Sequence, residues 1–180
     1  IYAGNLVGYG AMLMKALEAL KGHPHIRLEV RGNSSSWPDS IKNEMSELGL
    51  LLPFTSRDEL DRWLKTADAF LITQSFDEKS DRLMETNFPS KLVEYAQYGK
   101  PLVLWGPAKA SGPQWARNTG RGLVVDEENP DQLRIAIERL CHDEDEQQGL
   151  SNEARAAAAG EFDPELIQSQ FRKYLSEIIS

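Results

Sequence analysis

The chain has 180 residues, of which 41% are hydrophobic and 27% are charged, a composition that suits one globular domain. Its 28 acidic residues outnumber 20 Lys and Arg and give a net charge of −8, which argues against a general nucleic-acid binder. The single cysteine, Cys141, excludes an internal disulfide framework and a cysteine-rich metal site. No apolar run approaches the ~20 residues that span a bilayer. The chain opens at Ile1, inside an apolar run, so we expect it to be part of a longer protein.

The first half alternates short apolar runs, typical of strands, with helical patterns. In chain order we expect a strand at 1–3, a helix at 10–20, a strand at 26–30, a helix from Pro38 to about 48, and a strand at 50–54. Ser56 followed by Glu59 is a capping-box pattern, which predicts that the next helix begins there.

The second half continues the alternation and ends in helices. We expect a buried strand at 69–73, a polar loop at 74–88, a helix from Pro89 that Gly99 stops, strands at 101–105 and 122–125 around a short helix at 114–118, and helices at 130–140, 151–159 and 164–179. The acidic run 143–146 is read as a solvated helix start, which the helix dipole favours.

Strands separated by helices imply right-handed crossovers, and hence an α/β fold with a doubly wound parallel sheet. We therefore predict a Rossmann-like single domain over 1–180, with about six strands and a helical tail at 151–180. In such sheets ligands bind beyond the carboxyl ends of the strands. The candidate loops are 4–10, 31–37, 54–56, 74–88, 106–112 and 126–129.

One segment pairs donors for phosphate with an acceptor for sugar hydroxyls. A helix that starts at Pro89 leaves the amides of Ser90, Lys91 and Leu92 free to face an anion, and Lys91 adds a full charge. Glu94 lies one turn deeper on the same face, where its carboxylate could accept hydrogen bonds from two hydroxyls. This order fits the diphosphate and ribose of a nucleotide. The other interpretation, an ordinary surface helix with a Lys91–Glu94 ion pair, stays open at this point.

The run FPSKLVEYAQYGKPLVLWG at 88–106 resembles the C-terminal, nucleotide-sugar-binding half of GT-B glycosyltransferases of the family-4 type (glycosyl transferases group 1). Shared features are the proline-started helix, the carboxylate in its second turn, and the Gly99–Pro101 turn into an apolar strand. The resemblance implies retaining transfer of a sugar, of the hexosyl type, from a nucleoside diphosphate to an acceptor in polysaccharide or glycoconjugate assembly.

The resemblance also implies roles for individual residues. Glu94 corresponds to the carboxylate that grips the ribose hydroxyls, and the helix amides face the diphosphate. The first loop approaches the phosphates or the sugar, and the segment after the third strand frames the base. The nucleotide-sugar-binding set is thus Gly4, Asn5, Phe54, Thr55, Pro89, Ser90, Lys91, Leu92 and Glu94. No metal and no cofactor are implied besides the substrate, a UDP- or GDP-linked sugar.

Two positions depart from the family pattern. A carboxylate usually stands eight residues before the ribose carboxylate, where this chain has Thr86; the adjacent Glu85 is the candidate catalytic residue. A basic pair that usually clamps the diphosphate has no counterpart in 4–10. Lys91 is the first candidate for that charge, and the weaker candidates are Arg31, Lys79 and Arg82.

The expected partners are the nucleotide-sugar donor and an N-terminal acceptor domain of the same protein, with no nucleic acid and no integral membrane segment. Without that domain the chain should bind donor and transfer nothing. The expected location is cytoplasmic, with peripheral membrane association of the full-length protein left open. The apolar stripe of the tail, which begins at Phe162, should cross to the missing domain and be partly exposed here. Two alternatives remain: a degenerate GT-B domain acting as a binding or assembly module, and the second half of a sugar-nucleotide epimerase.

Overall fold

The computed structural model describes residues 1–6 and 10–179, and its centre is a set of parallel strands. The strands are β1 (Tyr2–Asn5), β2 (Val30–Asn33), β3 (Leu51–Leu52), β4 (Phe70–Thr73), β5 (Leu102–Trp105) and β6 (Leu123–Val125). Hydrogen bonds join them as two sheets, β1-β2-β3 and β4-β5-β6.

The two sheets meet where β1 lies beside β4. The terminal ammonium of Ile1 donates to the carbonyl of Ala69 at 2.9 Å, and the amide of Leu71 donates to the carbonyl of Ile1 at 3.0 Å. The strand order across the molecule is therefore 3-2-1-4-5-6, as a doubly wound fold requires. The predicted fold class and strand number are confirmed, but within the described residues the pairing with β4 is made by Ile1, just before β1, and does not continue at Ala3.

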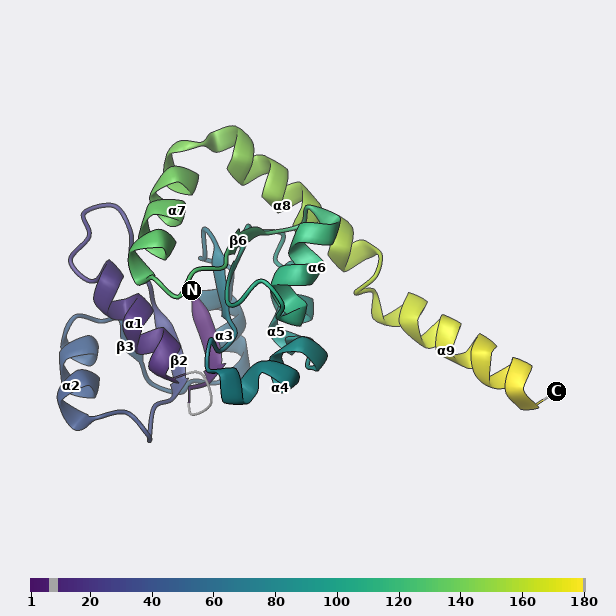
Figure 1. Cartoon of the computed structure of the whole chain (residues 1–180), viewed down its shortest axis with the longest axis horizontal. Helices are drawn as coiled ribbons and strands as arrows, with labels where there is room; N and C mark the ends of the chain where they lie inside the picture. Colours follow the sequence, from purple (N-terminus) through teal and green to yellow (C-terminus); the bar gives the residue numbers. More distant parts are fainter. Residues whose placement is uncertain (7–9, 180) are drawn as a thin grey trace.

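Helices cover both faces of the strands (Figure 1). They are α1 (Gly10–Leu20), α2 (Asp39–Glu47), α3 (Arg57–Leu64), the 3-10 turn η1 (Glu78–Ser80), α4 (Asp81–Thr86), α5 (Ser90–Ala96), α6 (Ser111–Thr119), α7 (Pro130–His142), α8 (Glu144–Ala159) and α9 (Pro164–Ile179).

Successive side chains along each strand pack alternately into two separate hydrophobic cores. Leu71 points to the face covered by α1, α2 and α7, whereas Phe70 and Ile72 point to the face covered by α3, α5 and α6. The helix α5 is fixed to the second face by Leu92 and Tyr95, which are both fully buried. The start of α5 is thereby held at the carboxyl ends of β1 and β4.

Several elements differ from the sequence prediction. The strand β3 is shorter than the expected 50–54, and α6 and α8 begin before the expected 114 and 151. The expected strand at 26–30 begins only at Val30 and continues to Asn33. Gly32 allows this, because a Cβ there would overlap the carbonyl oxygen of Gly4 on β1. The expected polar loop 74–88 contains η1 and α4, whose one buried residue, Met84, gives no helical period in the sequence.

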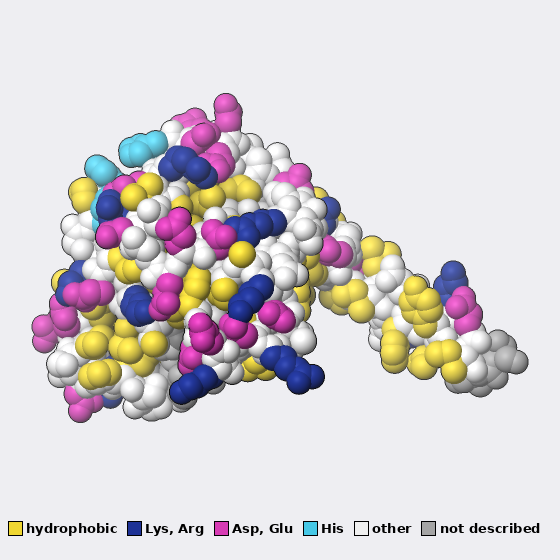
Figure 2. Space-filling model, in the orientation of Figure 1, with side chains coloured by type: hydrophobic (Ala, Val, Ile, Leu, Met, Phe, Trp, Pro, Cys, Tyr) yellow, Lys and Arg dark blue, Asp and Glu magenta, His cyan; other side chains and the backbone are white. Residues whose placement is uncertain are grey.

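The last helix, α9, extends away from the rest of the molecule as an arm (Figure 1). Its apolar side chains gather along the arm in the space-filling view (Figure 2), and Ile178 is 80% exposed. Phe162, just before the helix, is buried at 6% exposure against Trp115. The predicted partial exposure of the stripe is therefore confirmed: the stripe is packed at Phe162 and open along α9.

Candidate functional site

The first feature of the site is a contact between Lys91 in α5 and Gly4 in β1. Gly4 has a φ of 138°, a backbone conformation that L side chains rarely adopt. A Cβ at this position would overlap the Lys91 ammonium and lie 2.9 Å from Lys91 Cε. Only glycine therefore leaves room for the lysine, which reaches from the first turn of α5 to the carboxyl end of β1.

The Lys91 ammonium is half-buried and lies 5.1 Å from the centroid of the Tyr2 ring, a cation–π contact. Burial lowers the pKa of Lys91 from its usual range, and the nearby charge of Glu94 opposes that shift. Among the side chains that the structure describes, no carboxylate forms an ion pair with this ammonium. The charge is thus held at the sheet edge without a neutralising partner, which suits it to receive an anion.

Glu94 lies three residues after Lys91 and is exposed at the surface of α5. The two side chains share one helix face, but their interaction is charge attraction without a direct ion pair. The Lys91–Glu94 ion pair of the alternative interpretation, an ordinary surface helix, is therefore not formed among the described side chains. The carboxylate of Glu94 stays free to accept hydrogen bonds from a ligand on the solvent side of the ammonium.

The start of α5 differs in one detail from the expectation. Pro89 is the N-cap residue and not the first helical residue, and the Leu92 amide already donates to the Pro89 carbonyl at 2.9 Å. The amides open to a ligand are therefore those of Ser90, which is exposed, and Lys91. The Leu92 side chain is buried in the core and anchors the helix.

The other predicted residues lie at the same sheet edge but apart from Lys91. Asn5 ends β1 beside Asn33, although its side chain is not described, and the predicted loop residues 7–9 lie outside the described part of the chain. Phe54 follows β3, two strands away, and is 73% exposed. Thr55 donates its hydroxyl hydrogen to Glu59 in α3. The structure thus brings Gly4, Lys91 and Glu94 together and leaves Phe54 and Thr55 at a neighbouring position.

The candidate catalytic residue Glu85 is exposed on α4, and the Thr86 hydroxyl bonds back to the Arg82 carbonyl at 2.8 Å. Lys109 forms an ion pair with Asp81, which raises the pKa of Lys109, and the nearby charge of Glu85 raises it further. Glu85 therefore belongs to a surface charge group on α4, and within the described part of the chain no hydrogen bond or ion pair joins it to Lys91.

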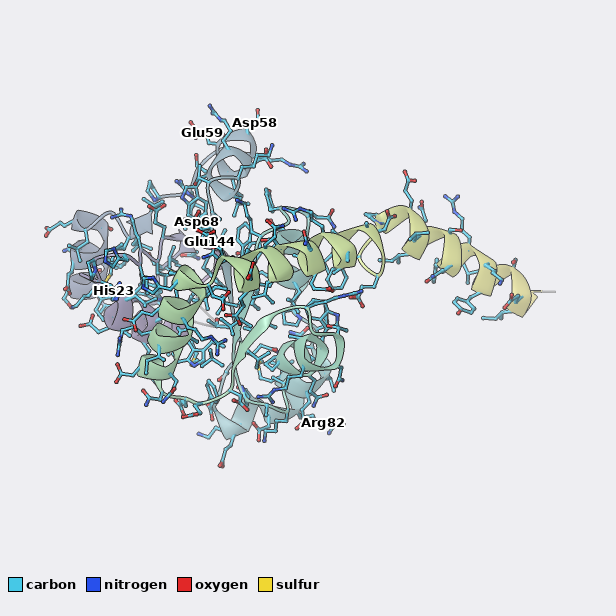
Figure 3. The ribbon with its side chains drawn as sticks, turned by 90° about the horizontal axis from the view of Figure 1, so that it is seen from above. His23, Asp58, Glu59, Asp68, Arg82 and Glu144 are labelled. Atoms are coloured by element: carbon cyan, nitrogen blue, oxygen red, sulfur yellow. The ribbon has the colours of Figure 1, made fainter. Side chains whose placement is uncertain are left out.

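The weaker basic candidates are engaged or remote. Arg31 donates to the Pro53 carbonyl at 2.6 Å and lies 4.9 Å from the Trp63 ring centroid. Lys79 is exposed, and Arg82 projects outward from the rim of the molecule (Figure 3). Of the four basic residues considered, Lys91 is the one that contacts the end of β1.

Two residues that the sequence reasoning did not select organise the site. The Tyr95 hydroxyl bonds to Ala3 on β1, and Gln74 at the end of β4 bonds to Gly112 at the start of α6. In the sequence, Tyr95 looks like an ordinary core residue of an amphipathic helix, so nothing there indicates a role at the site. Gln74 carried one usable signal, since it is a polar residue directly after a continuous apolar strand.

One hollow of the molecule lies away from this site. Its volume is about 600 Å³, and it is lined at the amino ends of β1 and β4 by residues such as Ile1, Asp68 and Cys141. Within residues 1–6 and 10–179, no group of three His, Cys, Asp or Glu side chains is placed to hold a metal ion. No helix of that part of the chain is both long and apolar enough to cross a bilayer.

Comparison with known proteins identifies the family. The profile of the glycosyl transferases group 1 family matches residues 8–157. The chain belongs to this family. No curated protein sequence matches the chain.

Solved structures of glycosyltransferases share the fold. The Anabaena protein Alr3699/HepE, solved with UDP-glucose, superposes with a TM-score of 0.71 at 20% identity over 98% of this chain and 48% of that one. A glycosyltransferase from Rickettsia africae gives a TM-score of 0.71 at 16% identity, over 99% and 48% of the two chains. This chain thus spans about half the length of these proteins.

A third structure is itself a single domain. It is the C-terminal domain of the glycosyl transferase group 1 family protein LpcC from Francisella tularensis, with a TM-score of 0.58 at 11% identity, over 91% of this chain and 86% of that one. The fold is the Rossmann-like half of a GT-B glycosyltransferase, and its extent fits a C-terminal domain.

Proposed function

We propose that this chain is the donor-binding domain of a retaining glycosyltransferase of the family-4 type, and that it binds a nucleoside-diphosphate sugar at the carboxyl ends of β1 and β4. The observation that carries the proposal is the unpaired Lys91 ammonium against Gly4, with the free Glu94 carboxylate on the same helix face. A cation next to a carboxylate one turn away matches a diphosphate next to a ribose diol.

The proposed chemistry follows from these groups. Lys91 and the amides of Ser90 and Lys91 would stabilise the charge that develops on the leaving diphosphate, so the transfer needs no metal ion. Glu94 would accept hydrogen bonds from the ribose hydroxyls and fix the nucleotide in register. Phe54 and Thr55, at the end of β3, would frame the base from the neighbouring strand, and Asn5 would approach the phosphates or the sugar.

We further propose that transfer requires an acceptor domain that this chain does not contain. The Anabaena and Rickettsia africae proteins that share this fold are about twice the length of the chain, which supports that arrangement. The exposed stripe of α9 is the surface that such a domain would cover. The full protein would act in polysaccharide or glycoconjugate assembly in the cytoplasm, as a hexosyltransferase.

Calorimetric titration of the folded chain with UDP, GDP and uridine tests the proposal. A diphosphate nucleotide should bind measurably and uridine much more weakly, and Lys91→Met should remove this advantage. Lys173→Met, which deletes the same charge on α9, is the matched control and should bind as the wild type does. A folded chain that binds neither UDP nor GDP at millimolar concentrations contradicts the proposal.

A binding or assembly module without transferase activity is the second candidate. Thr86 at the usual carboxylate position and the lack of a basic pair in 4–10 favour it. Both candidates predict nucleotide binding by this chain. Transfer of a labelled sugar by the full-length protein separates them, and the anomeric configuration of the product tests the retaining mode.

A further inference from the structure

The parallel pairing of β1 with β4 begins normally and then stops. Ile1 accepts from Leu71 and donates to Ala69, so a continued ladder would bond the Ala3 amide to the Leu71 carbonyl. Instead, the Ala3 amide donates to the Tyr95 hydroxyl at 2.7 Å, and that hydroxyl donates to the Ala3 carbonyl at 3.0 Å. For Ala3, the Tyr95 hydroxyl thus takes the place of the backbone groups of β4.

A tyrosine hydroxyl suits this position because it donates one hydrogen bond and accepts another. Both polar groups of Ala3 are satisfied by one atom in a site where Tyr95 has no measurable exposure. The ring stacks on Phe70 of β4, with centroids 4.4 Å apart and planes 15° apart. The hydroxyl is therefore held at a fixed place between the two strands.

Lys91 lies one turn before Tyr95 on the same face of α5 and reaches β1 one residue nearer to its carboxyl end. Its ammonium lies where a Cβ of Gly4 would stand. Tyr95 and Lys91 thus contact successive residues of β1, Ala3 and Gly4.

We propose that Tyr95 is a positioning residue for the donor site: its hydroxyl holds β1 away from β4 and keeps open the gap in which the Lys91 ammonium meets the diphosphate. This inference rests on the proposed function. A phenylalanine at 95 would leave the Ala3 amide and carbonyl without partners, and β1 could regain them by pairing with β4. That movement would close the gap and push the lysine into solvent.

Tyr95→Phe in the folded chain tests the proposal, alone and combined with Lys91→Met. UDP affinity should fall at least fivefold for Tyr95→Phe, yet change less than twofold when Lys91 is already methionine, because the effect passes through the lysine. Equal losses in both backgrounds would overturn the proposal and leave Tyr95 a structural residue only. Tyr98→Phe is the control, since its hydroxyl bonds to Asp61 of α3 at 3.1 Å and not to β1, and it should leave UDP affinity unchanged.

A measurement without nucleotide keeps this inference separate from the proposed function. The Lys91 ammonium, followed by NMR, should titrate below the usual lysine range in the wild type and return toward that range in Tyr95→Phe. An unchanged Lys91 titration would overturn the positioning role even if UDP binds. If UDP does not bind the wild type at all, the proposed function fails, while this titration still decides whether Tyr95 places the lysine.

A second measurement on the wild type decides the matter if Tyr95→Phe does not fold. UDP should then shift the NMR signals of the Lys91 ammonium and the Ala3 amide together, because both report on the gap. A shift of the lysine signal with no change at Ala3 would overturn the proposal.

Discussion

The Gln74 side-chain carbonyl accepts a 2.9 Å hydrogen bond from the amide of Gly112 and so ties the end of β4 to the first turn of α6. Its amide nitrogen donates to the Met84 carbonyl at 3.1 Å, which attaches α4 to the same point. The N-cap residue of α6, Ala110, has no side chain that could cap these amides, so Gln74 takes that role from another element.

Gln74→Met should therefore destabilise the chain, because the side chain keeps its volume but leaves the Gly112 amide and the Met84 carbonyl without partners in a buried site. We expect a loss of about 1–3 kcal/mol in the free energy of unfolding, measured by denaturant titration. Gln97→Met, at the exposed C-cap position that follows α5, is the control and should stay within about 0.5 kcal/mol of the wild type. Equal stability of the two variants would contradict the capping role.

Glu94→Gln should weaken UDP binding, because the ribose hydroxyls would lose the carboxylate that accepts their hydrogen bonds. If the carboxylate accepts hydrogen bonds from the diol, the wild type should bind UDP about tenfold more tightly than 2′-deoxy-UDP, and Glu94→Gln should lose most of that difference. Titration calorimetry with both nucleotides measures it. Glu47→Gln, on the exposed surface of α2, should keep the wild-type ratio. A ratio that survives in Glu94→Gln would remove Glu94 from the ribose site.

Elements with strong local signals were predictable from the sequence. The apolar spacing of 10–20 and the proline at 164 predicted α1 and α9 with the bounds that the structure has. The strand β2 was not predictable, because Arg31, Gly32 and Asn33 have little strand preference, and pairing with β1 and β3 fixes them. Here the tertiary context overrides the local propensity.

The sequence predicts which residues of the helix at Pro89 form the site, but not how these residues contact β1. The helix at Pro89 and its Lys91 and Glu94 follow from the sequence pattern, because i and i+3 positions share a face. The pairing of Lys91 with Gly4 joins residues far apart in the chain, so spacing could not reveal it. The role of Tyr95 depends on an interrupted strand ladder, which exists only once β1 and β4 lie side by side.

Lys91→Met should raise stability at neutral pH, since it removes a charge whose burial is unfavourable. Because the folded state lowers the pKa of Lys91, the unfolded chain binds more protons between that lowered pKa and the ordinary lysine value. Wild-type stability therefore rises with pH through this window relative to Lys91→Met. The advantage of the variant should be full below the lowered pKa and vanish as pH approaches the ordinary value. Melting temperatures of both proteins from pH 7 upward measure it.

The control for this titration is Lys173→Met on the exposed surface of α9, whose stability difference from the wild type should not change in this way with pH. A constant difference between wild type and Lys91→Met across the alkaline range would mean that the ammonium of Lys91 is fully hydrated in the folded protein. That result would also remove the basis for placing it in the gap beside Gly4.

The two ends of the apolar stripe in the tail should respond differently to mutation. Phe162 is packed between Trp115, at a centroid distance of 5.4 Å, and Phe88, at 5.9 Å, so Phe162→Ala should cost about 3 kcal/mol in unfolding free energy. Ile178 is 80% exposed on the arm, so Ile178→Ser should change stability by less than about 0.5 kcal/mol. Denaturant unfolding of both variants measures these costs. A large loss for Ile178→Ser in this chain would mean that α9 packs against the domain, and its stripe would then not be available to an acceptor domain.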